Sequence, residues 1–307
     1  MTASTVMKLL LINKKDHQVR LFTLALAVMA LPVAAALPQY NLYLADLSKD
    51  LSVSNSIKIN DTATYINQPA FSGDGNSLFF TLEQGGDAAV QTDIGVYVIA
   101  DKKQDVLTKT ALSEYSPTLL PDGSGVSVVV VEADQTQRLW KVDWQGNSSL
   151  LKTEPKGVGY HAWGPHQDLL LFILGDQEDN HTVRYLDKNG KLTTLATGVG
   201  RALSWQPGTE KGYYTQARQD QLYLSFYDVK TTTVTATELA LPAGGQDLVW
   251  WSADRLLVSA GTKIYQWKAT GKQDWTLWLD LSKDCGTEIS RFALNKERSR
   301  LAFVCKL

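Results

Sequence analysis

The chain has 307 residues, of which 44% are hydrophobic and 20% are charged, and its formal net charge is −2. This length suffices for a large hydrophobic core, and one all-β domain can occupy all of it. The nearly neutral charge, without a basic patch or a Lys/Arg-rich helix, argues against nucleic acid as a partner.

The N-terminal segment, residues 1–36, has the pattern of a secretory signal peptide. Four basic residues lie between positions 8 and 20, and an almost wholly apolar run at 21–36 ends in Ala34-x-Ala36. A basic region, a short apolar core and small residues at the cleavage position are typical of such signals. The run is shorter than the roughly 20 residues that a membrane span needs. An uncleaved inner-membrane anchor is the alternative, and with either one we expect a periplasmic protein.

From residue 37 onward, one short unit recurs six times. Each unit has an apolar stretch, a tight polar turn and a second apolar stretch, as in two antiparallel strands joined by a hairpin. The units occupy 68–80, 116–131, 160–173, 202–214, 248–258 and 291–304. The last apolar residues before their turns are Phe71, Leu119, Trp163, Trp205, Trp251 and Leu294. A period of roughly 40–50 residues with several short strands in each repeat is typical of a β-propeller.

Two further strands are expected after each of the first five units. Third strands are predicted at 96–100, 139–143, 183–186, 222–227 and 264–267, and fourth strands at 106–109, 149–152, 192–196, 234–241 and 275–281. The sixth unit has only two strands before Leu307, whereas 41–46 and 57–60 resemble a third and a fourth strand. We therefore predict an all-β fold in which residues 37–307 form a single six-bladed β-propeller. Its N-terminal strands complete the last blade, which avoids open blade edges.

Several strings resemble those of TolB-like β-propellers, whose blades open with a turn similar to Pro-x-Phe-Ser-Pro-Asp-Gly. They are NQPAFSGDG, QTDIGVYV, SEYSPTLLPDG, QRLW and GYHAW, and the similarity covers nearly the whole chain after about residue 40. The resemblance implies an exported bacterial propeller, and TolB-like propellers act as periplasmic interaction modules. It is specific for the fold and weak for function, because a fold does not imply an activity.

The two cysteines, Cys285 and Cys305, lie before and within the last unit. In an exported protein a disulfide between them would persist, and it could staple the ring near its closure. Two unpaired cysteines are the alternative. A zinc site is not indicated, because no Cys or His lies nearby at ligand spacing.

Motifs that carry catalysis are missing from the sequence. It has no Gly-x-Ser-x-Gly nucleophile elbow, no P-loop and no Gly-x-Gly-x-x-Gly after a strand. The histidines after residue 36, His161, His166 and His181, are expected to be ordinary hydrogen-bonding residues. We therefore predict no catalytic residues, no metal and no cofactor.

Propeller geometry brings polar residues together at one mouth of the central channel. Strands alternate in direction within a blade, so the start of each first strand shares a face with the loop between the second and third strands. The candidate binding residues on this face are Asn67, Gln68, Asp93, Glu114, Tyr115, Gln137, Arg138, Tyr160, His161, Arg201, Asp247 and Arg291. Concave sites with convergent polar groups bind small molecules or peptides, although a water-filled channel mouth would be polar as well.

Our hypothesis is a monomeric, non-enzymatic module that binds a protein or peptide of the cell envelope through this mouth. The alternative is a small-ligand sensor or a metal-assisted, lactonase-like hydrolase at the same place. A Ca²⁺ site would need several oxygen ligands at one depth. The available oxygens are those of Asn67, Glu114 and Asp247, and the nearby Arg201 and Arg291 argue against tight cation binding.

Overall fold

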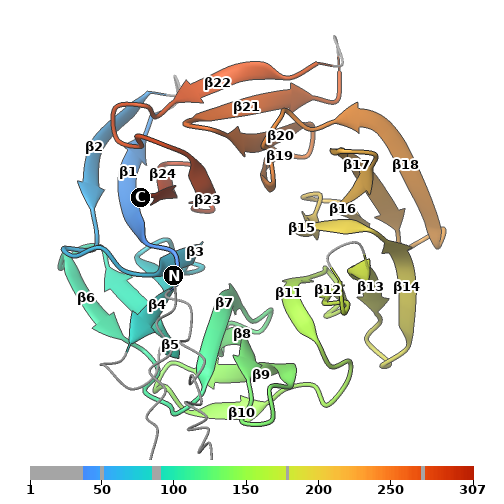
Figure 1. Ribbon diagram of the computed structural model, residues 1–307, viewed down its shortest axis with the longest axis horizontal. Helices are drawn as coiled ribbons and strands as arrows, with labels where there is room; N and C mark the ends of the chain where they lie inside the picture. The colour runs from blue at the N-terminus through green and yellow to red at the C-terminus, as the bar shows by residue number, and fades with distance from the viewer. Residues whose placement is uncertain (1–36, 49–51, 85–90, 178–179, 271–273) are drawn as a thin grey trace, which may run out of the picture. The chain divides into compact units, whose positions relative to one another are not determined.

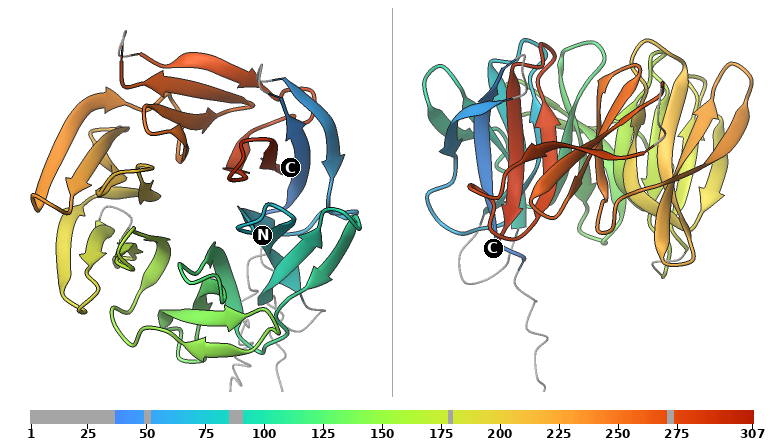
Figure 2. Two further views of the ribbon diagram at one scale, coloured as in Figure 1. Left: turned by 180° about the vertical axis from the view of Figure 1, so that it is seen from behind. Right: turned by 90° about the horizontal axis from the view of Figure 1, so that it is seen from above.

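The computed structural model describes residues 37–48, 52–84, 91–177, 180–270 and 274–307. These residues form 24 β-strands in six four-stranded antiparallel sheets. The sheets stand around a central axis as the blades of a propeller (Figure 1). The view from behind shows the same ring, and the view turned by 90° shows the blades edge-on (Figure 2). The predicted six-bladed, all-β fold is confirmed. The expected signal peptide lies outside the described residues.

Blades 1 to 5 follow the chain from the innermost strand outward. Blade 1 comprises β3 (Ile66–Phe71), β4 (Ser77–Gln84), β5 (Gln91–Val98) and β6 (Lys103–Val106). Blade 2 comprises β7 (Ser113–Leu119), β8 (Gly125–Val131), β9 (Gln137–Asp143) and β10 (Ser148–Leu150). Blade 3 comprises β11 (Val158–Trp163), β12 (Leu169–Ile173), β13 (Thr182–Leu186) and β14 (Leu192–Thr197). Blade 4 comprises β15 (Val199–Trp205), β16 (Lys211–Arg218), β17 (Gln221–Asp228) and β18 (Thr233–Ala240). Blade 5 comprises β19 (Asp247–Ser252), β20 (Arg255–Ala260), β21 (Lys263–Lys268) and β22 (Thr276–Asp280).

Blade 6 joins the two ends of the propeller. Its strands β23 (Ile289–Leu294) and β24 (Arg300–Lys306) come from the C-terminal end, and β1 (Tyr40–Leu47) and β2 (Val53–Lys58) come from the N-terminal end. β1 pairs with β24 in antiparallel register, with Tyr43 opposite Phe303. The rings of these two residues stack with centroids 5.0 Å apart. The predicted completion of the last blade by N-terminal strands is confirmed.

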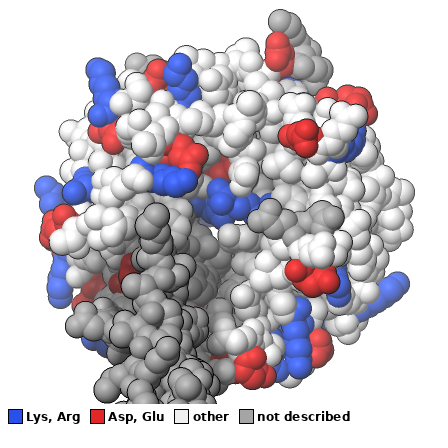
Figure 3. All heavy atoms as spheres, in the orientation of Figure 1, with Lys and Arg blue, Asp and Glu red and all other residues white. Residues whose placement is uncertain are grey.

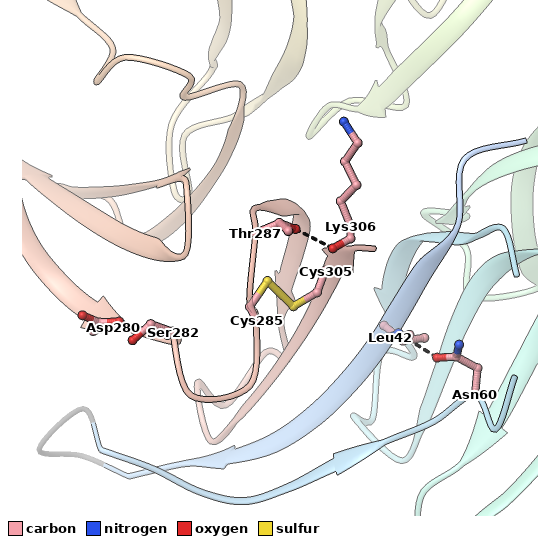
Figure 4. Close-up of a disulfide and its surroundings, with 8 residues drawn as sticks. All are labelled: Leu42, Asn60, Asp280, Ser282, Cys285, Thr287, Cys305 and Lys306. Atoms are coloured by element: carbon pink, nitrogen blue, oxygen red, sulfur yellow. Dashed lines mark hydrogen bonds between the residues drawn. A yellow bond between two sulfur atoms is a disulfide. The ribbon is translucent and has the colours of Figure 1, made fainter. Parts of the chain in front are cut away.

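A disulfide lies beside this closure. Cys285, in the loop after β22, is bonded to Cys305 on β24 (Figure 4). Both cysteines are buried, and they belong to a cluster that also holds Phe292 and Phe303. Close by, Asn60 accepts a hydrogen bond from the backbone N–H of Leu42 at 2.8 Å and so holds the segment after β2 against β1. Of the two possibilities left open by the sequence, the structure contains the disulfide.

The second strand of each blade carries most of the core. Every residue of β12 is buried, and so are six of the seven residues of β8. Both faces of such a strand pack against apolar side chains, which explains its continuous hydrophobic sequence. Burying a side chain the size of Leu or Phe contributes roughly 1.5–3 kcal/mol. The second strands therefore supply much of the stability of the ring.

The turns after the first strands of blades 1 and 2 each contain a glycine in a left-handed conformation. Gly75 and Gly123 both have a φ of 70°, a left-handed conformation in which glycine carries no steric penalty. The aspartate before each glycine accepts a hydrogen bond from the backbone two residues on, at 3.0 Å for Asp74 and 2.9 Å for Asp122. The Asp-Gly pairs thus fix the turns that position the first strands.

The outermost strands differ most from the predictions. The fourth strand of blade 1 is Lys103–Val106 rather than 106–109, and the fourth strand of blade 6 is Val53–Lys58 rather than 57–60. Both strands are largely exposed, so they carry little of the alternating pattern from which strand bounds are predicted.

Within the part of the chain that the structure describes, no helix is long and apolar enough to cross a membrane.

Candidate functional site

The first strands of all six blades line one small cavity, which we call the central cavity. Its volume is about 220 Å³. The polar residues in its lining are Gln68, Ser116, Thr118, Tyr160, His161, Arg201, Asp247 and Arg291. Figure 3 shows basic side chains beside the hollow at the middle of the ring. Six of the twelve candidates from the sequence therefore meet here: Gln68, Tyr160, His161, Arg201, Asp247 and Arg291.

Two of the first strands reach the cavity through strained backbone. Gln68 and Ser116 have φ values of 55° and 56°, and each precedes a proline. Such left-handed residues cost of order 1–3 kcal/mol each and persist only where their surroundings hold them. Here the Gln68 side-chain oxygen accepts hydrogen bonds from Thr81 Oγ1 at 2.6 Å and from the Ser116 backbone N–H at 3.1 Å. This contact joins blades 1 and 2 at the cavity wall.

Two arginines converge on one carbonyl oxygen at the cavity. Arg201 Nη2 donates to the oxygen of Ser290 at 2.8 Å, and Arg291 Nη1 donates to the same oxygen at 3.2 Å. The Nε of Arg201 is buried and has no hydrogen-bond partner among the described residues. Buried donors without partners are rare in folded proteins. The two cationic groups are thus held together with donor capacity to spare.

Asp247 is the single carboxylate in the lining of the cavity. Its Oδ2 accepts a hydrogen bond from the backbone N–H of Phe292 at 2.8 Å, and its Oδ1 lies 3.8 Å from Arg291 Nε. Burial raises the pKa of Asp247, while Arg291 and Arg201 lower it. Burial and the charge of Arg291 lower the pKa of Arg201, and Asp247 opposes them. With all three groups ionised the cavity carries one net positive charge.

Aromatic side chains border the cationic pair. The guanidinium carbon of Arg291 lies 5.1 Å from the ring centroid of Tyr160, which is a cation–π distance. Tyr65 makes edge contacts with Tyr40 and Tyr115, with centroids 5.7 Å and 6.3 Å apart. Burial is the main cause that raises the pKa of Tyr65 above its usual value, so its phenol remains neutral. Tyr160 thus offers a flat, uncharged surface next to the guanidinium group of Arg291.

A second cavity, which we call the interblade groove, lies between blades 3 and 4. Its volume is about 490 Å³, and its lining includes Phe172, His181, Gln221 and Leu222. Tyr160 and Arg201 line both this groove and the central cavity. The two cavities therefore adjoin at these two side chains.

Glu114 and Asp93 do not line the central cavity but are buried beside each other on neighbouring strands. Glu114, on β7, is 1% exposed and accepts a hydrogen bond from Thr110 Oγ1 at 3.0 Å. Burial raises its pKa to about 6, and the charge of Asp93 contributes. Asp93, on β5, accepts a long hydrogen bond from the Thr110 backbone N–H at 3.4 Å. This acid pair belongs to the contact between blades 1 and 2.

The other candidates lie outside the cavity lining. Asn67 is buried, and its side-chain oxygen accepts a hydrogen bond from the Gln68 backbone N–H at 2.8 Å. Tyr115 contacts Tyr65 and packs against the apolar cluster around Val129 and Leu139. Gln137 and Arg138 begin β9, where Arg138 forms an ion pair with Glu132. The structure therefore separates these residues from Arg201, Asp247 and Arg291.

His161 is held as a neutral side chain. Its Nε2 lies 2.6 Å from Ser127 Oγ, which also accepts a hydrogen bond from Trp163 Nε1 at 2.8 Å. Burial lowers the pKa of His161 to about 3. Ser127 is fully buried, so this pair fixes β11 against β8 rather than presenting a nucleophile.

The three residues considered as oxygen ligands of a metal ion do not lie together. Asp247 lines the central cavity, whereas Asn67 and Glu114 do not. Among the described residues, no group of three or more His, Cys, Asp or Glu side chains could hold a metal ion. Tyr65, Ser116 and the interblade groove were not predicted from the sequence. Tyr65 directly precedes the first strand of its blade, which was the available signal.

Comparisons with known proteins reveal similarity in fold. No protein-family model matches the chain, and no curated protein matches its sequence. A solved TolB from Agrobacterium tumefaciens has a TM-score of 0.64 and 14% identity, over 88% of this chain and 99% of that chain. A TolB from Acinetobacter baumannii has a TM-score of 0.55 and 10% identity, over 87% of this chain and 63% of that one. A structure described as a gluconolactonase has a TM-score of 0.56 and 10% identity, over 81% of this chain and 90% of that one. In its fold, the chain is therefore a TolB-like six-bladed β-propeller.

Proposed function

We propose that this protein is an exported, non-enzymatic propeller that binds a protein or peptide of the cell envelope through the central cavity and the interblade groove. The observation that carries the proposal is the shared wall of these two cavities, formed by Tyr160 and Arg201. Tyr and Arg are the residue types that most often dominate binding energy at protein interfaces. A partner segment placed there would contact both side chains.

Three further observations support the envelope location. The pattern of residues 1–36 is typical of a signal peptide. The disulfide between Cys285 and Cys305 suits an oxidising compartment such as the periplasm. Solved structures with this fold include proteins described as TolB.

The test is affinity capture from an envelope extract with the full chain as bait. The double variant Tyr160→Ala/Arg201→Gln is expected to lose the captured partner while its melting temperature stays within a few degrees. The matched control is Arg218→Gln/Tyr223→Ala, which makes the same two substitutions at an Arg–Tyr pair that lines neither cavity; its guanidinium carbon lies 4.7 Å from the ring centroid. Equal recovery of the partner by the wild type and the Tyr160/Arg201 variant would exclude this surface as the binding site.

A small-ligand sensor or a lactonase-like hydrolase is the second candidate. It is favoured by the similarity in fold to the structure described as a gluconolactonase. Calorimetry with Ca²⁺ and Zn²⁺, followed by hydrolysis assays with a panel of lactones, tests it directly. Metal-dependent turnover that is lost in Asp247→Asn would establish this function in place of the first.

A further inference from the structure

We propose that the guanidinium groups of Arg201 and Arg291 bind the C-terminal carboxylate of a peptide whose preceding residues run outward along the interblade groove. This inference rests on the proposed function and specifies its ligand. It follows from the donors, the charge and the shape of the two cavities.

Arg201 and Arg291 supply the hydrogen-bond donors of the proposed site. The two guanidinium groups approach one another closely enough to share the Ser290 oxygen, at 2.8 Å from Arg201 and 3.2 Å from Arg291. A guanidinium has five N–H donors in a fork that fits a carboxylate in a bidentate manner. The buried Nε of Arg201, a residue that lines both cavities, lacks a partner among the described residues. A carboxylate between the arginines would accept hydrogen bonds from guanidinium donors that no described residue satisfies.

The charge of the site selects the kind of anion. With Arg201, Arg291 and Asp247 all ionised, two positive charges face one carboxylate, and the lining has one net positive charge. A carboxylate, with one negative charge, neutralises it. A phosphate dianion would leave a negative excess beside Asp247, where repulsion is strengthened by the low local dielectric. The charge balance of the cavity therefore favours a ligand with one negative charge.

The shape indicates the end of a chain. The central cavity, at about 220 Å³, has room for a terminal residue, and the adjoining groove, at about 490 Å³, has room for the residues before it. The groove is lined by Phe172, Leu174 and Leu222 together with Gln219 and Gln221. This mixture suits an extended peptide, with apolar contacts for side chains and amide groups for the backbone. Capture of a C-terminal carboxylate is a known mode of peptide recognition.

The experiment compares two pools of randomised tetrapeptides on the immobilised full-length protein. One pool has free C-terminal carboxylates and the other is amidated. We expect the free-acid pool to be retained at least tenfold better, and Arg201→Gln or Arg291→Gln to remove that preference. Arg184→Gln, the same substitution at an arginine that lines neither cavity, should retain it. Equal retention of the two pools by the wild type would overturn the proposal.

A gain-of-binding variant separates the site from folding defects. Asp247→Asn raises the net positive charge of the cavity, and its amide oxygen can still accept the hydrogen bond from the Phe292 backbone. Retention of the free-acid pool should increase several-fold in this variant, which an unfolded protein could not produce. Unchanged or weaker retention by a folded Asp247→Asn protein would argue against a carboxylate beside Asp247.

Competition identifies the source of the anion. Acetate and gluconate should displace the free-acid peptides only weakly, because they lack the residues that occupy the groove. If gluconate binds in an arginine-dependent manner and no peptide does, the peptide part of the proposal is wrong. If inorganic phosphate competes better than acetate, the assignment of a monoanion is wrong. If the Arg201→Gln/Arg291→Gln protein still captures its envelope partner, the carboxylate proposal fails while the interaction function stands.

Discussion

Buried polar residues around the channel mouth are of two kinds. Thr81 and Ser127 are hydrogen-bonded inside the wall, where they hold neighbouring strands together. Arg201 instead keeps a buried nitrogen without a partner among the described residues. Buried polar groups without partners are costly, and perturbed charged groups in clefts often mark functional sites. For Arg201, which also lines both cavities, the unpartnered nitrogen favours ligand binding over a purely structural role.

Glu114 yields a prediction about stability and pH. Its pKa rises from 4.5 in the unfolded chain to about 6 in the folded protein, mainly through burial. Because the pKa is raised in the folded protein, the protonated Glu114 carboxyl contributes its full stability below about pH 4.5. This contribution is lost as the pH rises through about 6. At about 1.4 kcal/mol per pKa unit, the loss by pH 7 is roughly 2 kcal/mol. Urea unfolding should therefore find Glu114→Gln more stable than the wild type by up to this amount at pH 7, and no more stable at pH 4.

The opposite sign is expected for Glu132, which provides the control. Its hydrogen bond from Arg138 is the main cause that lowers its pKa. A lowered pKa gives stability that is present above the unfolded pKa and is lost as the pH falls, so Glu132→Gln should not stabilise the protein at pH 7. A Glu114→Gln variant that is destabilised at pH 7 would show that the ionised carboxylate is well accommodated.

At the scale of strands, the hydrophobic pattern of the sequence predicted the bounds of the inner strands of each blade better than those of the outermost strands. Second strands such as β12 are continuous apolar runs because both of their faces are buried. The outermost strands β6 and β10 are mostly or fully exposed. Their bounds depend on backbone pairing, which leaves little trace in the side chains. This explains why 106–109 was predicted where Lys103–Val106 pairs with β5.

The burial of β12 leads to a second prediction. Leu170 is fully buried between blades 3 and 4, whereas Leu277 on β22 is 53% exposed. Leu170→Ala should lower the free energy of unfolding by about 2–5 kcal/mol, since it removes contacts and leaves a cavity. Leu277→Ala should change it by less than about 0.5 kcal/mol. Denaturant titration of both variants measures the difference, and equal effects would contradict the placement of the core.

The disulfide supports a third prediction. It closes a loop of 20 residues between Cys285 and Cys305. A loop of this length is expected to contribute about 3 kcal/mol by restricting the unfolded chain. Reductant should lower the urea midpoint of the wild type, and it should have no effect on Cys285→Ser/Cys305→Ser. A wild-type midpoint that is insensitive to complete reduction would show that the ring closes without this bond.

The candidate site was predictable only in part, because the sequence does not show toward which face of a strand each side chain points. Arg201, Asp247 and Arg291 were found because each lies at the start of a first strand. Glu114 lies at an equivalent place, but its side chain is buried between blades. Successive side chains of a strand point to opposite faces, and bulges shift that alternation, as between Asn67 and Ala70. Sequence alone does not reveal where such bulges fall.

At the scale of the whole molecule, the ring depends on strands from both ends of the chain. Removal of residues 37–60, together with the segment before them, would leave β24 as an unpaired edge and expose its buried side chains. Unpaired edges of this kind promote aggregation. The truncated protein should be recovered mainly in inclusion bodies and lack the circular dichroism of a folded sheet. Removal of residues 1–36 alone should leave a soluble, cooperatively unfolding protein, and comparable solubility of the two truncations would contradict the role of β1.

The pairing of β1 with β24 also has a consequence for the order of events during synthesis. The ribosome makes β1 first and its partner β24 last, with more than 200 residues between them. One edge of β1 must therefore wait for its partner until β24 has been made, although β2 can pair with the other edge at once. Blade 6 cannot assemble completely from the start of the chain onward, and a chaperone that shields the free edge of Tyr40–Leu47 would protect the nascent chain for that whole interval.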